Sequence, residues 1–80
     1  MTNDSVLTTV RAAVRVLAPG GVVADDTPLI AAGIIDSLSL LSLIARLEEE
    51  FRITVRDVEV LPANFGSIDA IRSFLTTKGL

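Results

Sequence analysis

Apolar positions in the first part of the chain recur at steps of three and four residues, which is the spacing of one face of an α-helix. Asp4 or Ser5 is expected to cap this helix at its start. Pro19-Gly20-Gly21 is expected to stop it, because a proline moves the preceding Ala18 out of the helical region. The face predicted to point into the core consists of Val6, Leu7, Val10, Val14 and Leu17.

The strongest helical pattern runs from Leu38 to Phe51, and Asp36 is a suitable N-cap for it. At about 100° per residue, its apolar side chains fall into two separate stripes. The wider stripe, predicted to face the core, contains Leu40, Leu43, Ile44, Leu47 and Phe51. The narrower stripe, predicted to face away from the core, contains Leu38, Leu41 and Ala45, with Glu48 and Glu49 at its edges.

Residues 19–35 are predicted to form a long connection between these two helices. Within it, Thr27-Pro28 is expected to start a short turn that Gly33 ends. A loop of this length in a small domain is often functional.

Residues 52–61 alternate like a hairpin with Arg56-Asp57 at its turn, but that dipeptide is a poor hairpin turn and a lone hairpin is marginal. The sequence favours an extended segment with a short helical turn within residues 57–65. Ser67 is expected to cap a last helix that Gly79 ends. Its core face is predicted to contain Ile68, Ile71, Phe74 and Leu75. The whole pattern predicts an all-α domain over residues 1–80, with three main helices and one short helix.

Composition narrows the possible functions. Half of the 80 residues are hydrophobic, which excludes a disordered tail. The chain has no cysteine and no histidine, so it lacks disulfides, thiolate metal sites and the commonest general base and metal ligand. No pair of residues suggests a nucleophile with its base, and we expect neither enzymatic activity nor a metal site. The net charge of −3 and the presence of only three aromatic residues, all Phe, argue against nucleic-acid binding.

Acidic charge is concentrated in the middle of the chain. Residues 25–50 carry a net charge of −5, whereas the segments before and after each carry +1, so a partner that docks there is expected to be basic. The start of the chain lacks the features of a secretory signal. The longest apolar stretch, Leu29–Ile35, is far shorter than the roughly 20 residues needed to span a bilayer. A cytoplasmic monomer without membrane contact is expected.

The segment Gly33-Ile34-Ile35-Asp36-Ser37-Leu38 resembles the acyl carrier protein family. Members of this family are small helical bundles that carry 4′-phosphopantetheine on the serine of an Asp-Ser-Leu sequence, at the start of their second helix. Here Asp36-Ser37-Leu38 follows the long loop and opens the strongest predicted helix. Leu61–Ile68 is also similar to the segment that leads into the last helix of many carriers. The resemblance extends from Val6 to Leu75.

The resemblance implies that Ser37 bears the phosphopantetheine and that Asp36 orients it. A phosphopantetheinyl transferase would supply the group from coenzyme A with Mg²⁺, and cargo would travel as a thioester on the terminal thiol. The partners implied are an acyltransferase, ligase or synthase with a basic docking surface. Leu41→Arg and Glu48→Lys are expected to weaken transfer and to leave the fold intact. The predicted docking surface consists of Leu38, Leu41, Ala45, Glu48 and Glu49.

Departures from the family pattern indicate the type of carrier. Ser39 and Ser42 stand where fatty-acid-synthesis carriers usually have acids. The Leu-Gly-Gly of modular peptidyl carriers is replaced by Ala31-Ala32-Gly33. These differences favour a free-standing bacterial carrier of a polyketide, antibiotic or related secondary-metabolite pathway. A D-alanyl or aminoacyl carrier is one alternative, and a helical interaction module that is never modified is another.

Overall fold

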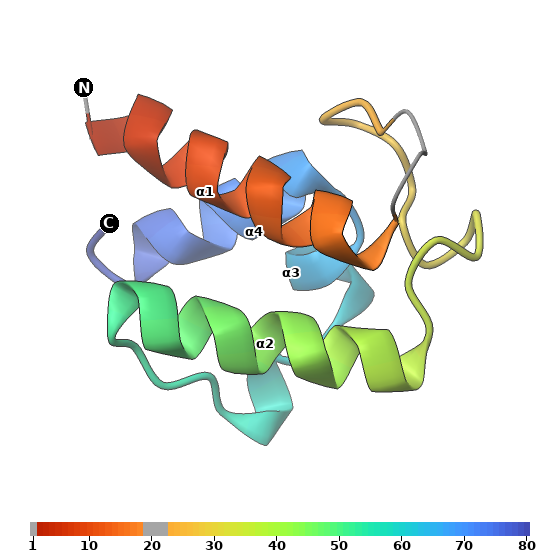
Figure 1. Ribbon diagram of the computed structural model, residues 1–80. Coiled ribbons are helices and arrows are strands. Elements are labelled where there is room, and N and C mark those ends of the chain that lie inside the picture. The colour runs from red at the N-terminus through yellow and green to blue at the C-terminus, as the bar shows by residue number, and fades with distance from the viewer. Residues whose placement is uncertain (1, 19–22) are drawn as a thin grey trace.

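A computed structural model describes residues 2–18 and 23–80 of the chain. Within these residues it contains helices and no strand, which confirms the predicted all-α class (Figure 1). The longer helices are α1, α2 and α4, and two short elements join α2 to α4. The elements in chain order are α1 (Thr2–Leu17), α2 (Ser37–Phe51), the 3₁₀ turn η1 (Asp57–Glu59), α3 (Pro62–Phe65) and α4 (Ile68–Thr77).

The ends of α1 differ in part from the prediction. This helix begins at Thr2, so the predicted cap at Asp4 or Ser5 is wrong, and both residues lie inside the helix. Polar residues are common in the first turn of a helix as well as at its cap, and the sequence pattern does not distinguish these positions. The stop predicted at Pro19-Gly20-Gly21 lies outside the described residues, and α1 ends at Leu17.

The core forms where α1 packs against both α2 and α4. Most of the predicted core residues of α1, α2 and α4 are buried. Ala13 and Phe65, which were not predicted, are also buried. Four predicted core residues, Leu7, Leu17, Leu40 and Phe51, are only partly buried and pack against the edge of the cluster. The buried helical residues are Val6, Val10, Ala13, Val14, Leu43, Ile44, Leu47, Phe65, Ile68, Ile71, Phe74 and Leu75.

The connection before α2 is part of the core. Leu29 and Ile35 are fully buried. The backbone N–H of Leu29 donates to the carbonyl oxygen of Gly66 over 2.7 Å, which joins the loop to the turn between α3 and α4. The Arg11 guanidinium donates through Nε to Oδ1 of Asp25 over 2.9 Å, which joins the loop to α1. These contacts hold the loop against α1 and against the turn between α3 and α4.

The short turn predicted in this loop is confirmed. The backbone N–H of Ala32 donates to the carbonyl oxygen of Pro28 over 2.8 Å, and that of Gly33 donates to Ile30 over 3.0 Å. Gly33 has a φ of +75°, a conformation that glycine adopts without steric cost. The chain then reaches Asp36 in extended conformation and enters α2.

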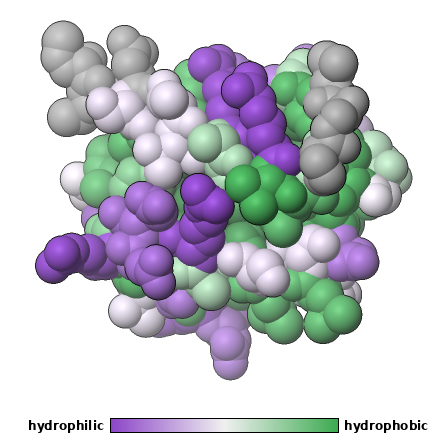
Figure 2. All heavy atoms as spheres, in the orientation of Figure 1, coloured by the Kyte–Doolittle hydropathy of each residue, from purple (hydrophilic) through white to green (hydrophobic). Residues whose placement is uncertain are grey.

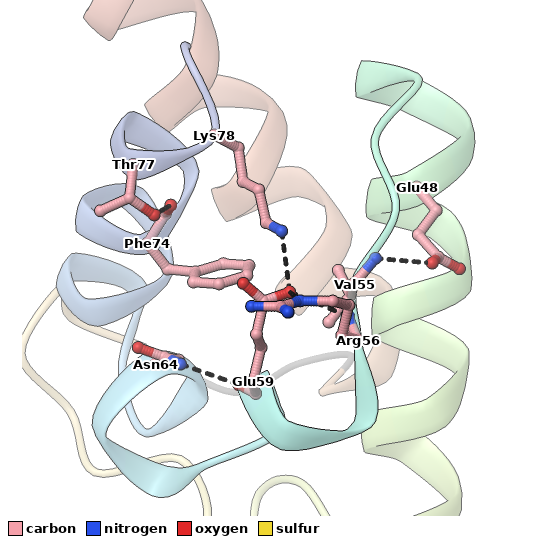
Figure 3. A network of polar contacts seen from close by, with 8 residues as sticks. All are labelled: Glu48, Val55, Arg56, Glu59, Asn64, Phe74, Thr77 and Lys78. Carbon is pink, nitrogen blue, oxygen red and sulfur yellow. Dashed lines mark hydrogen bonds and ion pairs between the residues drawn. The ribbon is translucent and has the colours of Figure 1, made fainter.

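The segment from α2 to α3 makes two helical turns, η1 and α3, where the sequence predicted one, and the hairpin alternative is wrong. Glu59 is central to its packing (Figure 3). Its Oε1 accepts hydrogen bonds from Lys78 Nζ at 2.7 Å and from the backbone N–H of Arg56 at 2.9 Å. Asn64 Nδ2 donates to the carbonyl oxygen of Glu59 over 2.8 Å. The segment is thereby attached to the end of α4.

No helix in the described part of the chain is both long enough and apolar enough to cross a membrane.

Candidate functional site

Ser37 is the first residue of α2, and its side chain is exposed. The preceding residue, Asp36, has the extended conformation of an N-cap, with φ −101° and ψ −173°. Its Oδ1 accepts a hydrogen bond from the backbone N–H of Ser39 over 2.8 Å. Asp36 thus fixes the backbone on both sides of Ser37, as the sequence predicted, and leaves the hydroxyl of Ser37 accessible.

The electrostatics at this end of α2 favour an anion. The hydrogen bond from the Ser39 backbone N–H lowers the pKa of Asp36 below its usual value, so its carboxylate is charged at neutral pH and occupied as a cap. The first turn of α2 contains no acidic side chain. N–H groups in the first turn of a helix lack partners within the helix and lie at the positive end of its dipole. A phosphate ester on Ser37 would meet this positive end.

A hollow of about 310 Å³ adjoins Ser37. Loop residues form one side of it and the first turn of α2 forms the other. Ile30 in this wall was not among the predicted site residues, because it lies in the apolar stretch Leu29–Ile35, where no helical period distinguishes a site residue from a core residue. The residues that line the hollow are Ile30, Gly33, Ile35, Asp36, Ser37 and Leu40.

The narrower apolar stripe of α2 faces solvent, as its position on the helix predicted. Leu38 is 76% exposed and Leu41 is 61% exposed. Ala45 and Glu49 are also exposed and continue the stripe toward the end of the helix. Figure 2 shows apolar surface at the lower right, near the start of α2, and strongly polar surface at the left, near its end. The structure thus places these four predicted docking residues on one accessible face.

Glu48, the fifth predicted docking residue, has a structural contact that the sequence did not reveal. Its Oε2 accepts a hydrogen bond from the backbone N–H of Val55 over 2.9 Å, and the side chain is partly buried (Figure 3). Glu48 therefore holds the segment after α2 against the helix. The expectation that Glu48→Lys leaves the fold undisturbed does not agree with this contact, because a lysine cannot accept the hydrogen bond.

Acidic residues do not gather into a metal-binding group in the described ranges. Within residues 2–18 and 23–80, no three Asp or Glu side chains lie close enough to hold an ion.

The residues around Ser37 fit a phosphopantetheine group. An exposed hydroxyl stands at the positive end of α2, the one adjacent carboxylate is occupied as a cap, and a hollow with apolar walls lies beside it. The chain matches the family model described as the phosphopantetheine attachment site over residues 4–74. No curated protein sequence matches the chain closely enough to count as a relative. Because the family match covers most of the chain, the protein belongs to the phosphopantetheine-attachment family of carrier proteins, whose prosthetic group is 4′-phosphopantetheine.

Proposed function

We propose that residues 1–80 form a single carrier domain and that Ser37 is the residue to which its phosphopantetheine is attached. The observation that carries this proposal is the exposed hydroxyl of Ser37 at the N-terminus of α2, directly after the capping Asp36. Ser39 and Ser42 are nearby on the same helix but lie beyond its first residue. Only Ser37 combines exposure with this position in the helix and with a place in the wall of the hollow.

Attachment requires a transferase, coenzyme A and Mg²⁺. The Oγ of Ser37 forms a bond to the phosphorus that bears the pantetheine. The bond from this phosphorus to the oxygen that bridges the two phosphorus atoms breaks, and adenosine 3′,5′-bisphosphate leaves with that oxygen and the electron pair of the bond. The hydroxyl proton passes to a base of the transferase or to solvent. In this step the carrier itself contributes only an accessible hydroxyl on a fixed backbone.

The attached group supplies a terminal thiol on which an acyl or aminoacyl cargo is held as a thioester. The carrier's own residues anchor this group at one end of α2 and tether its cargo near a docked partner, which raises the effective concentration of the cargo. The chain contains no cysteine, so no side-chain thiol competes for the thioester. We propose that the chain has no catalytic residue of its own.

Carrier domains of this family work with phosphopantetheinyl transferases and with synthases. For this chain we propose that partners dock on the exposed stripe of α2 formed by Leu38, Leu41, Ala45 and Glu49, with Glu48 at its edge. The exposed leucines provide apolar contact area, and the surrounding segment 25–50 has a net charge of −5. A partner surface with an apolar pocket and a basic rim is complementary to this combination.

The proposed role is a free-standing carrier of a polyketide or related secondary-metabolite pathway in the bacterial cytoplasm. Ser39 and Ser42, at positions where fatty-acid-synthesis carriers usually have acids, support this assignment. A D-alanyl or aminoacyl carrier is the second candidate, because the Gly33–Ser37 segment is also similar to that group. An unmodified interaction module is the third alternative that the sequence left open, and the family match over residues 4–74 argues against it.

Intact mass after incubation with coenzyme A, Mg²⁺ and a promiscuous phosphopantetheinyl transferase tests the attachment site. The wild type is expected to gain one phosphopantetheine and Ser37→Ala none. Ser42→Ala is the matched control, because it removes an exposed hydroxyl from the same helix and is expected to gain the full group. A gain in Ser37→Ala would contradict the assignment. The absence of any gain in a folded wild type would favour the interaction module.

A further inference from the structure

The hollow beside Ser37 is lined mainly by apolar residues, and the attachment of a phosphate ester does not by itself require such a lining. Its walls include the side chains of Ile30, Ile35 and Leu40. Ile30 is 38% exposed, which leaves an aliphatic side chain at the surface next to the buried Leu29. Exposed aliphatic side chains that line a concave surface often mark a contact site for an apolar group.

Gly33 keeps the hollow open on the loop side. A Cβ built at this residue would have no atom within 4 Å, so the surrounding space is empty. Its φ of +75° also disfavours any residue with a side chain at this position. The turn that orders the loop therefore leaves room beside Ser37.

The group attached to Ser37 has an apolar part close to its attachment point. After the phosphate comes one methylene and then a quaternary carbon with two methyl groups, which is the pantoyl part of pantetheine. Amides and the thiol lie farther out. Since Ser37 itself lines the hollow, only a few bonds separate the wall from the two methyl groups. The more polar, distal part of the arm can extend into solvent.

We infer that the hollow formed by Ile30, Gly33, Ile35 and Leu40 is a binding site for the pantoyl dimethyl group of the arm on Ser37. This inference rests on the proposed function. The contact holds the base of the arm on the loop side of α2. Leu38 and Leu41, which do not line the hollow, remain free for a docking partner.

The tether favours this occupant over a free ligand. A group that is attached to the wall has an effective concentration in the millimolar range at that wall, so a weak apolar contact is sufficient for binding. The hollow is open to solvent and Ser37 is one of its lining residues, so no large conformational change is needed for the arm to leave it. The base of the arm therefore exchanges between a bound position and a free one.

Nuclear Overhauser measurements on the modified protein test the inference. The protein is loaded from coenzyme A labelled with ¹³C in the pantoyl methyl groups, and intact mass first confirms the modification. Cross-peaks are expected between the pantoyl methyl protons and the methyl protons of Ile30 and Leu40. Ile30→Ser removes much of the apolar wall and is expected to lower the bound-to-free ratio of the arm about fivefold. Val16→Ser changes an exposed apolar residue outside the hollow and is expected to retain the cross-peaks.

The outcomes separate this inference from the proposed function. A modified wild type without cross-peaks to Ile30 and Leu40 would overturn the pantoyl site and leave Ser37 as the attachment residue. Equal cross-peak intensities in Ile30→Ser and the wild type would also overturn it. A folded wild type that gains no mass would refute the attachment and the pantoyl site together. The wild-type spectrum decides the inference even if Ile30→Ser does not fold.

Discussion

At the scale of single residues, Glu59 has polar contacts with Arg56, Asn64 and Lys78. Its carboxylate accepts from Lys78 Nζ and from the backbone N–H of Arg56, and Lys78 also lies 5.5 Å from the centre of the Phe74 ring (Figure 3). The hydrogen bond from Lys78, and then that from Arg56, lower the pKa of Glu59 below its usual value. Ionised Glu59 thus connects η1 to the end of α4 through an ion pair with Lys78, and protonation of Glu59 would weaken this contact.

This contact makes the stability depend on pH. Because the pKa of Glu59 is lowered in the folded state, its contribution is complete above the usual glutamate pKa of about 4.3 and is lost as pH falls through the lower folded value. Glu59→Gln is therefore expected to be less stable than the wild type at neutral pH and to lose less stability on acidification. Urea unfolding between pH 7 and the acid range measures this difference.

Glu50→Gln is the matched control for Glu59→Gln, since it removes the charge of an exposed acid at the end of α2. Its pH dependence is expected to follow that of the wild type. Equal pH slopes for Glu59→Gln and the wild type would show that the contact with Lys78 does not stabilise the fold.

Among the elements, α2 and α4 were predictable because each has a long apolar period and a capping side chain at its start. Asp36 caps α2, and Ser67 Oγ accepts the backbone N–H of Ala70 over 3.0 Å at the start of α4. The segment 52–65 was less predictable, because η1 and α3 are too short for a periodic pattern. Their placement depends on contacts with residues distant in sequence, such as that of Glu59 with Lys78.

The residue that caps the C-terminus of α2 has a left-handed backbone conformation, which residues other than glycine rarely adopt. Arg52 has a φ of +54°, in the left-handed region that favours glycine. Its backbone N–H donates to the carbonyl oxygen of Glu48, a contact that glycine would also make. Arg52→Gly is expected to raise the free energy of unfolding by about 0.5–1 kcal/mol, because relief of the strain exceeds the added chain entropy. Chemical denaturation measures the change.

Thr54→Gly serves as the control for Arg52→Gly. Thr54 is exposed in the same segment and does not have a positive φ, so glycine there is expected to lower the stability slightly. A fall in stability for Arg52→Gly as large as that for Thr54→Gly would show that the left-handed residue is not strained.

The exposed stripe of α2 is expected to be a functional surface and not a structural one. Leu41→Arg should lower the kcat/KM of phosphopantetheinyl transfer about tenfold, because it places a charge in the apolar centre of the proposed interface. Its melting temperature should stay close to that of the wild type. Val16→Arg is the matched control, since Val16 and Leu41 are both 61% exposed. Equal losses of transfer in both variants, or none in Leu41→Arg, would contradict the docking assignment.

At the scale of the whole molecule, the loop before α2 contains core residues that the sequence did not predict. Leu29 and Ile35 are fully buried, yet no helical period marks them as core residues. Their burial depends on docking against the turn between α3 and α4, where the N–H of Leu29 meets the carbonyl oxygen of Gly66. The same loop supplies Ile30 to the hollow beside Ser37, so the missed core residues and the missed site residue have one cause.

A bundle of this size depends on each buried side chain. Leu47 is fully buried between the helices, and Leu47→Ala is expected to lower the free energy of unfolding by about 2–5 kcal/mol. Native domains have only about 5–15 kcal/mol of stability, so this loss is a large part of the total and a marked fall in melting temperature is expected. Leu38→Ala makes the same truncation at a residue that is 76% exposed, and it should melt close to the wild type. Similar melting temperatures for both variants would contradict the assigned core.

Locating the prosthetic group on the peptide shows whether Ser37 bears it. Tandem mass spectrometry of the modified wild type, after digestion, distinguishes Ser37 from Ser39 and Ser42 on α2. The fragments that carry phosphopantetheine are all expected to contain Ser37, and those bearing only Ser39 and Ser42 are expected to be unmodified. Phosphopantetheine on a fragment that lacks Ser37 would refute the proposed attachment site.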